Sequence, residues 1–442
     1  VQKQYNRAMN SDSYVDFFRQ TSPYIHKHRG KTFVIALDGD TVAHANFHRT
    51  IHDIALLQSL GIRIVLVHGA RPQIDQRITQ AGEQSQFHNQ LRITDNSAMQ
   101  SVKEALGSTR WQIEAELSTG LPNSPMHGAQ VKAIGGNFIT AKPMGILDGV
   151  DYQHTGEVRG IDAESIKQQL QMGGLVLLSP IGFSPTGEAF NLSYQEVAAQ
   201  TAIAINAEKL ILVTEVSGIL EDKNLLRSLS VPEAKALQAK SDNTAQSKLL
   251  ETACCACSEG VNRVHLVSCA EDGALLTELF TRDGSGTLVM QDHSEVIRSA
   301  AIEDVGGILD LIAPLEEQQI LVKRSRELLE TEISRFTLVL HPEGDLLGCA
   351  ALYPTSDSSQ GEVACMATNP EFLNQGIATR LLQRLEADAL KAGMARIFVL
   401  TTQTAHWFLE QGFVEVALSD LPKQKQSLYN YQRNSRIFSK IL

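Results

Sequence analysis

The sequence predicts an α/β chain in which a three-layer αβα sandwich is followed by a smaller α+β domain. From Lys31 to about Met290, short apolar runs rich in β-branched residues alternate with helical patterns, whereas from Ile297 helices and strands follow a different order. Continuous apolar runs are typical of parallel strands that helices cover on both faces. We therefore expect two domains, at residues 1–290 and 295–442, and a length of 442 residues suits more than one hydrophobic core.

The strands expected in the first part are the apolar runs 32–37, 62–67, 175–178, 210–213 and 264–267. Helices are expected between them, among others over residues 46–60 and 195–206. Each strand is followed by Gly, Ser, Thr or Pro residues, and a parallel sheet binds its ligands at these carboxyl ends. An amphipathic, aromatic-rich stretch at residues 14–20 precedes the first strand. It indicates either a surface-packing helix or an oligomer contact.

The second part is expected to run through two helices, a strand pair, a third strand, a helix, a fourth strand and a final helix. The strand pair covers residues 337–340 and 346–353, joined by a turn at 341–345. The third strand spans residues 361–367, and the fourth spans residues 397–400.

Charge and composition exclude several classes of protein. A formal net charge of −11 argues against a nucleic-acid partner, and no apolar run reaches the roughly 20 residues that cross a membrane. The start of the chain lacks the apolar segment of a secretory signal, and the missing initiator Met indicates a processed start. The six cysteines show neither disulfide nor zinc spacing, so we expect a cytoplasmic protein without a metal site.

The most informative segment is residues 366–378, which reads as a strand that passes through a turn into an amphipathic helix. Clustered backbone N–H groups at such a helix start bind a pyrophosphate without a lysine. Gly376 allows the backbone to approach the ligand, and Ala378 is small enough to keep the helix start open. The segment therefore predicts a site for coenzyme A.

Together with the strand at 361–367 and the segment 407–413, this turn resembles the GCN5-related N-acetyltransferase (GNAT) family. The resemblance covers about residues 295–442 and implies acetyl-CoA as cosubstrate. It implies that the cofactor-binding residues are Cys365, Met366, Ala367, Asn374, Gln375, Gly376, Ile377, Ala378 and Thr379. Leu373 stands where the family often has Arg or Gln, and Phe408 stands where many members have a tyrosine that protonates the departing thiolate.

Acetyl transfer to an amine needs a general base, because the nucleophile must lose its proton. Glu362, on the strand that leads into the cofactor turn, is our candidate, and an ordinary strand-edge carboxylate is the alternative. Thr401 and Thr402, which follow the strand at 397–400, are candidates for a proton relay or for strand-end capping. His406 is a further candidate, or a residue of a helix surface.

Two basic clusters, at residues 321–326 and 429–435, suggest which amine is acetylated. Two separated arginines suit an acceptor with two carboxylates, whereas solvated basic faces are the alternative. Here the resemblance narrows to the family of two-domain bacterial N-acetylglutamate synthases of the arginine pathway. It implies that L-glutamate is the acceptor and that its binding residues are Lys323, Arg324, Arg433 and Ser435.

Residues from about 20 to 290 resemble the amino-acid kinase family, and within it the acetylglutamate kinases. The resemblance rests on residues 30–35, 67–72, 135–138 and 190–193. Ala36 replaces the expected lysine, Gln195 replaces the aspartate that organises the kinase site, and Asp38 interrupts a glycine-rich segment, although Lys248 remains. Because phosphoryl transfer needs cations around the γ-phosphate, we expect a regulatory domain that is inactive as a kinase.

The same resemblance implies an arginine site and an oligomer. The residues that match the effector site of arginine-sensitive members are His265, Glu278 and Gly284; taken alone, they read as a buried strand histidine and a surface glutamate. That subgroup assembles into a hexameric ring through N-terminal helices, which would give the aromatics at residues 14–20 a purpose. We expect L-arginine to lower the use of glutamate or acetyl-CoA, which requires that it bind one domain arrangement better than another.

Two other functions are open to the sequence. The chain could be a working acetylglutamate kinase with an accessory acetyltransferase-like domain, which Ala36 and Gln195 argue against. It could also be a non-enzymatic arginine sensor whose C-terminal domain only binds a partner, which the intact Gly376, Ala378, Arg324 and Arg433 argue against.

Overall fold

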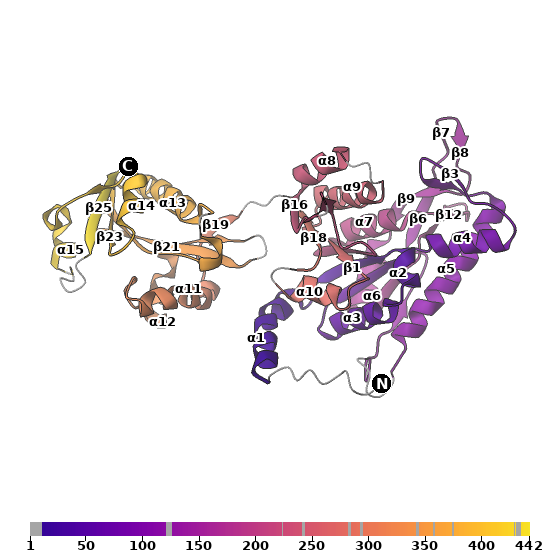
Figure 1. The fold of residues 1–442 in the computed structure, drawn as a ribbon, viewed down its shortest axis with the longest axis horizontal. Helices are drawn as coiled ribbons and strands as arrows, with labels where there is room; N and C mark the ends of the chain where they lie inside the picture. Colours follow the sequence, from indigo (N-terminus) through magenta and orange to yellow (C-terminus); the bar gives the residue numbers. More distant parts are fainter. Residues whose placement is uncertain are drawn as a thin grey trace. The chain divides into compact units, whose positions relative to one another are not determined.

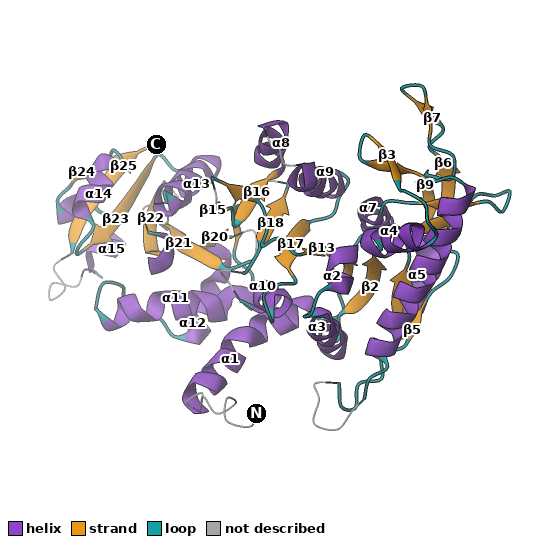
Figure 2. Ribbon diagram, turned by 45° about the vertical axis from the view of Figure 1, so that its right-hand side comes forward, coloured by secondary structure: helices purple, strands orange, loops and turns teal. Residues whose placement is uncertain are grey.

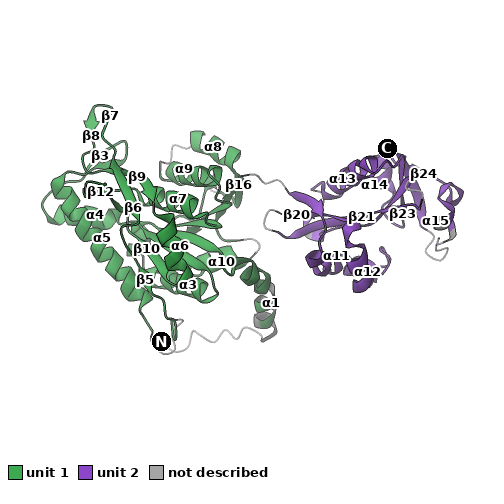
Figure 3. Cartoon of the chain, turned by 180° about the vertical axis from the view of Figure 1, so that it is seen from behind, with its two compact units in different colours: residues 1–292 green, residues 293–442 purple. Residues whose placement is uncertain are grey.

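The computed structural model describes residues 11–120, 126–222, 224–240, 244–281, 284–291, 295–341, 344–356, 359–373, 375–427, 429 and 435–442. The chain divides into two compact units, residues 1–292 and 293–442 (Figure 3). Within the described ranges, no helix has the length and apolar character needed to span a membrane.

The first unit is built on an eight-stranded sheet (Figure 1). Its strands are, in spatial order, β16 (Ser228–Ser230), β18 (Thr287–Met290), β17 (Arg263–Ser268), β13 (Lys209–Thr214), β1 (Thr32–Leu37), β2 (Arg63–His68), β10 (Leu175–Leu178) and β5 (Ala133–Ile134). Neighbouring strands run parallel, except that β17 and β18 are antiparallel. All five predicted apolar runs are strands of this sheet.

Helices cover both faces of this sheet, which confirms the predicted αβα sandwich. One face packs against α6 (Ala163–Gln171), α7 (Tyr194–Ile205), α8 (Val231–Lys240) and α9 (Thr244–Ser258). The other packs against α1 (Ser11–His28), α3 (Phe47–Ser59), α5 (Asn96–Leu117) and α10 (Ala274–Phe280). In β1, Val34 and Ala36 face the first set while Phe33 and Ile35 face the second, so burial on both sides explains the unbroken apolar run.

Smaller elements surround the carboxyl ends of the strands. Helices α2 (Gly39–Ala43) and α4 (Arg71–Gln80) begin directly after β1 and β2. A second sheet contains β12 (Ala189–Asn191), β11 (Ile181–Phe183), β6 (Ile139–Pro143) and β9 (Gly156–Ile161). Three short strand pairs are β3 (Gln86–His88) with β4 (Leu91–Ile93), β7 (Ile146–Leu147) with β8 (Val150–Asp151), and β14 (Leu220–Glu221) with β15 (Asn224–Leu225).

The second unit is a seven-stranded sheet with helices on both faces (Figure 2). Its spatial order is β19 (Val296–Ser299), β20 (Phe336–Leu340), β21 (Leu346–Pro354), β22 (Gln360–Thr368), β23 (Arg396–Thr401), β25 (Arg436–Ile441) and β24 (Val414–Glu415). The neighbours are antiparallel apart from the central pair β22 and β23, which is parallel. The mixed sheet with segregated helices confirms the predicted α+β architecture.

Different helices pack on the two faces of this sheet. On one face lie α11 (Val305–Glu317) and α12 (Arg326–Glu332), and on the other lie α13 (Ile377–Lys391) and α14 (Ala405–Glu410). Short 3₁₀ turns occur at Ile302–Asp304, Ile333–Arg335, Pro370–Phe372 and Leu418–Asp420, and the last of them precedes α15 (Lys423–Ser427). The predicted order omitted β19 at the start of this unit and β24 and β25 at its end.

Asp38 begins α2 and is a largely buried carboxylate. Its Oδ1 accepts a hydrogen bond of 2.6 Å from the Thr41 N–H, an ordinary N-cap. Burial raises the pKa of Asp38 to about 6. The folded chain therefore binds a proton here more tightly than the unfolded chain, and stability falls as pH rises from the unfolded value of about 4 through about 6.

We predict that Asp38→Asn stabilises the first unit by about 1–2 kcal/mol at pH 8, because the amide oxygen keeps the cap without a buried charge. Urea unfolding at pH 8 and at pH 4.5 measures this, and the advantage should largely vanish at the lower pH. Asp40→Asn, at the exposed neighbour, is the control. An equal effect of Asp38→Asn at both pH values would contradict the burial argument.

Candidate active site and effector site

The central strands of the second unit diverge and leave an opening in the sheet. Strands β22 and β23 pair only from Gln360 to Glu362, where Glu362 lies beside Phe398. Strand β22 then continues to Thr368, paired with β21 alone in the described part of the sheet. One edge of β22 therefore keeps main-chain N–H and C=O groups that no neighbouring strand pairs, as an extended ligand requires.

A β-bulge lies in the part of β22 that borders this opening. The register with β21 shifts between Cys349 and Ala351, and Cys365 has a left-handed φ of 51°. Val363 packs on the face that carries α13, whereas Cys365 and Ala367 pack on the face that carries α11. In a regular strand all three side chains would lie on one face, because alternate residues share a face. The bulge therefore turns the strand locally and directs its main-chain groups toward the opening.

Helix α13 starts at the turn that the sequence marked as a phosphate site. Gly376 is its N-cap, with a φ of 74° that favours glycine, and no described side chain caps the first amides. Gln375 and Gly376 are exposed, while Ile377 anchors the turn in the core. Uncapped amides at the positive end of a 15-residue helix fit a pyrophosphate. Ala378 and Thr379 lie in the first turn, and Asn374 lies outside the described residues.

Glu362 and Arg324 lie on the same face of the sheet. Glu362 pairs in register with Tyr353, and directly opposite residues point to the same face. The Tyr353 hydroxyl donates to Glu332 at 2.7 Å, and Arg324 interacts with Tyr353 and Cys365. Arg324 is half-buried in the segment between α11 and α12, where its N–H donates to Glu316 at 2.9 Å. A guanidinium is thus held one strand away from the candidate base.

A third element reaches Glu362 from the opposite side of the opening. Lys425 on α15 forms an ion pair with Glu362. The segment before α15 packs by Leu421 against Phe398 and Ile437. Ser435 is buried, and its carbonyl accepts a 2.7 Å hydrogen bond from the Tyr429 hydroxyl.

Two further residues were predicted to bind glutamate. Lys323 is exposed, and Arg433 lies outside the described residues.

The threonines after β23 form a cap. The Thr401 oxygen accepts from the Thr404 N–H at 3.1 Å and lies 2.8 Å from the Thr404 hydroxyl, while Thr402 is exposed. This arrangement matches the capping interpretation of Thr401. His406 is exposed, 3.6 Å from Glu410, as expected for a helix surface, and Phe408 is buried in the core.

In the first unit, the backbone segments that follow β1 and β2 approach each other closely. A Cβ on Gly39 would lie 2.5 Å from Pro72 Cδ, and one on Gly69 would lie 2.9 Å from the Gly39 nitrogen. Ala36, at the position where the kinase resemblance expects a lysine, is fully buried. Position 36 therefore supplies no cation for phosphoryl transfer.

The other positions that marked the kinase site serve local purposes. Gln195 accepts a 2.9 Å hydrogen bond from the Ser193 hydroxyl at the start of α7. Lys248 is partly exposed and forms a 3.2 Å ion pair with Glu251. Within the described ranges, no cluster of three His, Cys, Asp or Glu side chains is arranged to hold a metal ion.

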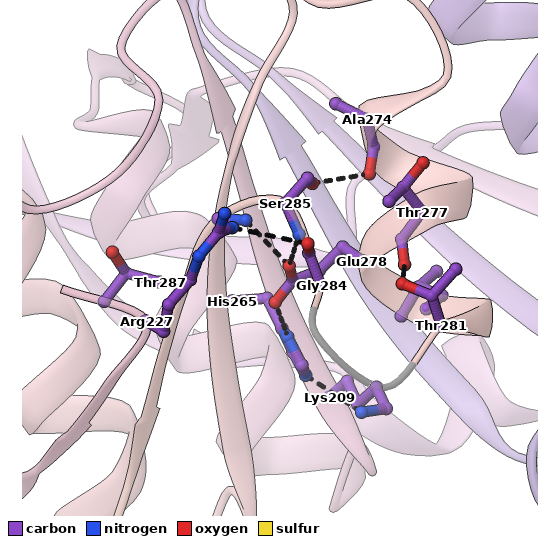
Figure 4. Close-up of polar contacts among 12 residues, drawn as sticks. Lys209, Arg227, His265, Ala274, Thr277, Glu278, Thr281, Gly284, Ser285 and Thr287 are labelled. Carbon is purple, nitrogen blue, oxygen red and sulfur yellow. Dashed lines mark hydrogen bonds and ion pairs between the residues drawn. The ribbon is translucent and has the colours of Figure 1, made fainter. Parts of the chain in front are cut away.

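His265, Glu278 and Gly284 come together at one end of the first unit (Figure 4). His265 Nδ1 lies 2.7 Å from Glu278 Oε1, and its Nε2 lies 2.9 Å from the Nζ of the buried Lys209. Glu278 Oε2 accepts the N–H groups of Ser285 and Gly286 at 2.7 Å and 2.8 Å.

Burial of Glu278 opposes its charge, but the bonds from His265 and the two amides outweigh it and lower the pKa of this carboxyl. The result is a buried, ionised carboxylate beside a turn. The Gly284 carbonyl accepts a 3.3 Å hydrogen bond from the Arg227 guanidinium, so this acceptor already binds an arginine side chain.

Sequence reasoning missed Lys209, Tyr353 and Lys425. Each contacts a residue that it did identify: His265, Arg324 and Glu362, respectively. Tyr353 and Lys425 lie in unremarkable local contexts, and only strand pairing or chain folding brings them to the site. A lysine at the start of an otherwise apolar strand was the one available signal, for Lys209.

Comparisons with known proteins cover both units. The model of the amino acid kinase family matches residues 31–268, and that of the acetyltransferase (GNAT) family matches residues 307–413. An amino-acid acetyltransferase of Pseudomonas syringae pv. syringae is 52% identical over 430 residues, 97% of this chain and 99% of the relative. One from Azotobacter vinelandii is 51% identical over the same shares.

Solved structures agree with these relatives. N-acetylglutamate synthase from Neisseria gonorrhoeae, complexed with coenzyme A and L-arginine, is 36% identical, with a TM-score of 0.84 over 98% of this chain and 100% of that chain. The same protein complexed with coenzyme A and N-acetyl-glutamate is 37% identical, with a TM-score of 0.62 over the same shares.

Proposed function

Because the chain belongs to the amino-acid acetyltransferase family, we propose that it transfers the acetyl group of acetyl-CoA to the α-amine of L-glutamate under the control of L-arginine. Family membership confirms the predicted resemblance, the amino-acid kinase-like and GNAT folds, and an acetyl-CoA-dependent acyltransferase activity. What we propose beyond this is that glutamate is the acceptor, that L-arginine is the effector, and that the residues named below have the roles given to them.

The pairing of Glu362 with Tyr353 is the observation that carries this proposal. It sets a carboxylate at the mouth of the opening and, one strand away, the half-buried Arg324. A base and a carboxylate-binding guanidinium on one face are what an amino-acid acceptor needs. Cofactor-binding amides line the same opening, at the bulge around Cys365 and at the start of α13.

We infer direct transfer without a covalent enzyme intermediate. Glu362 first takes a proton from the ammonium of glutamate, directly or through a water, and the freed nitrogen lone pair then attacks the thioester carbonyl carbon. Backbone N–H groups near Cys365 and Met366 stabilise the negative charge on the carbonyl oxygen. The carbon–sulfur bond then breaks, the nitrogen loses its second proton as the amide forms, and the departing thiolate of coenzyme A takes up that proton. Thr401 and Thr402 remain our candidates for relaying that proton.

Arg324 and Arg433 bind the two carboxylates of glutamate in this proposal, with Lys323 and Ser435 beside them. Bidentate pairing fits the planar guanidinium and selects carboxylates over amides. Glutamate should therefore be acetylated far better than glutamine. Release of coenzyme A from acetyl-CoA across a panel of amino acids tests this choice, and equal rates with glutamate and glutamine would refute it.

The first unit has a regulatory role in this proposal. The buried Ala36, which supplies no cation, supports the absence of kinase activity. An ATP-dependent acetylglutamate assay addresses that alternative. A sensor without catalysis is the other alternative, and glutamate-dependent release of coenzyme A would exclude it.

We further infer a cytoplasmic homo-oligomer, with a hexamer as the expected state. The amphipathic helix α1 supports this inference, because Phe18 is exposed although Tyr24 and Ile25 pack into the core. Sedimentation of the purified chain measures the oligomeric state.

We predict that Glu362→Gln lowers kcat by about 10²- to 10⁴-fold while the KM for acetyl-CoA stays within about twofold, because only proton transfer is lost. Steady-state release of coenzyme A measures both constants. Glu410→Gln, at an exposed glutamate of α14, is the control. A Glu362→Gln enzyme with normal kcat would remove Glu362 from the mechanism.

Arg324→Ala should raise the KM for glutamate by about 10- to 100-fold, the loss of one charge-assisted hydrogen-bonded pair, with little change for acetyl-CoA. Arg326→Ala provides a matched control, since Arg326 is two residues away and its side chain is 67% exposed. An unchanged glutamate KM in Arg324→Ala, or an equal rise for both substrates, would rule out the carboxylate clamp.

Arginine should reduce the rate of the wild-type enzyme. Glu278→Gln should raise the arginine concentration that gives half-maximal inhibition by about tenfold or more, because the buried carboxylate pairs with the guanidinium of arginine. The readout is the ratio of rates with and without arginine over a titration. Glu188→Gln, at an exposed loop position, is the control. An identical titration for Glu278→Gln and wild type would place the effector elsewhere.

A further inference from the structure

Lys425 lies outside every residue set assigned above, yet it contacts the candidate base. We propose that Lys425 is a positioning residue for acetyl transfer: its ammonium holds the Glu362 carboxylate at the opening between β22 and β23. The inference rests on the proposed function, since it assigns a role to Lys425 only through Glu362 as the base.

The ion pair joins Lys425 Nζ to one carboxylate oxygen, Oε2 of Glu362. The two side chains are 31% and 17% exposed, so water screens this pair less than it screens an exposed pair such as Arg326 with Glu330, at 67% and 40%. Oε1 is left as the oxygen that accepts the substrate proton. The pair thus restrains the carboxylate without using both of its acceptors.

Lys425 itself comes from an anchored segment. Its backbone N–H donates to the Pro422 carbonyl at 2.8 Å. The neighbouring Gln426 side chain donates to the carbonyls of Leu421 at 2.6 Å and Ser419 at 3.1 Å. Leu421 is buried against Phe398, the β23 residue that pairs with Glu362. The lysine is therefore tied to the strand that flanks its partner.

A restrained base is useful because a free glutamate side chain samples several rotamers, and only one directs an oxygen at the amine. Holding that rotamer before the substrate arrives removes the entropic cost from the chemical step. The cation has a second effect. Glutamate arrives as an ammonium, and a positive charge beside it disfavours the protonated form and so favours the nucleophilic amine. During transfer Lys425 stays protonated and gives up no proton.

Alternative contacts of Glu362 do not supply this restraint. Its strand neighbours in register are Tyr353, whose hydroxyl donates to Glu332, and the apolar Phe398. Among the described residues, the cation that forms an ion pair with the Glu362 carboxylate is Lys425.

The test uses the full-length enzyme, four single variants and one double variant. Lys425→Met removes the charge and keeps the stem; Lys425→Arg restores a cation. Lys423→Met, at an exposed lysine of the same helix, is the matched control. Glu362→Gln, alone and combined with Lys425→Met, supplies the background in which Lys425 has no ionised partner. Thermal melts of each variant show whether it is folded.

We expect Lys425→Met to lower kcat by about 10- to 100-fold while the KM for acetyl-CoA stays within about twofold. Lys425→Arg should regain most of the loss, and Lys423→Met should match wild type. In the Glu362→Gln background, Lys425→Met should cost less than about twofold, since residues that act as a unit are non-additive.

Three results would overturn the inference: a normal kcat in Lys425→Met, the same fold loss with and without Glu362, or a loss that Lys425→Arg does not rescue in a folded protein. Failure of the proposed function is recognised separately. Wild type that releases no coenzyme A with glutamate would sink the proposed reaction, and an active Glu362→Gln would sink only the assigned base. If Lys425→Met is unfolded, the kcat of Lys425→Arg relative to Lys425→Gln decides in its place.

Discussion

The second unit has an opening in its sheet because β22 and β23 separate after Glu362, and the candidate site is built around that opening. Two parallel strands pair for three residues and then separate, so β22 presents main-chain groups to a ligand on one edge while β21 supports the other. The bulge at Cys365 re-aims that edge. Helix α13 brings uncapped amides on one face, whereas on the other Lys425 pairs with Glu362 and Arg324 interacts with Tyr353 and Cys365. One break in strand pairing thus separates cofactor recognition from acceptor chemistry.

The first unit illustrates how a fold can keep its frame and change its chemistry. Its sheet retains strand ends followed by helix starts, the usual place for a phosphate, but the buried Ala36 supplies no cation there. A buried, ionised Glu278 instead organises a polar cluster on β17 and α10. In the proposed function this charge receives the guanidinium of arginine, so the proposed regulation in this unit and the proposed catalysis in the other depend on the same kind of pairing.

The features that could be predicted from the sequence are those that depend on a local pattern of residues. The buried strands were visible because both of their faces are covered, and the segment at 366–378 was visible because glycine and small residues precede an amphipathic helix. Sequence reasoning missed β19, a four-residue edge strand, and β25, which follows a basic polar segment. It also missed Tyr353 and Lys425, because their roles depend on register and on the path of the chain between β24 and β25 rather than on neighbours in sequence.

The central claim is that the open edge of β22 and the start of α13 hold the acyl thioester through backbone amides. Hydrogen–deuterium exchange with and without saturating coenzyme A measures this directly. Coenzyme A should slow exchange over residues 363–368 and 375–380 and leave exchange unchanged in β1 and β2 of the first unit. Binding of coenzyme A, shown independently, with no protection in either segment would contradict this claim.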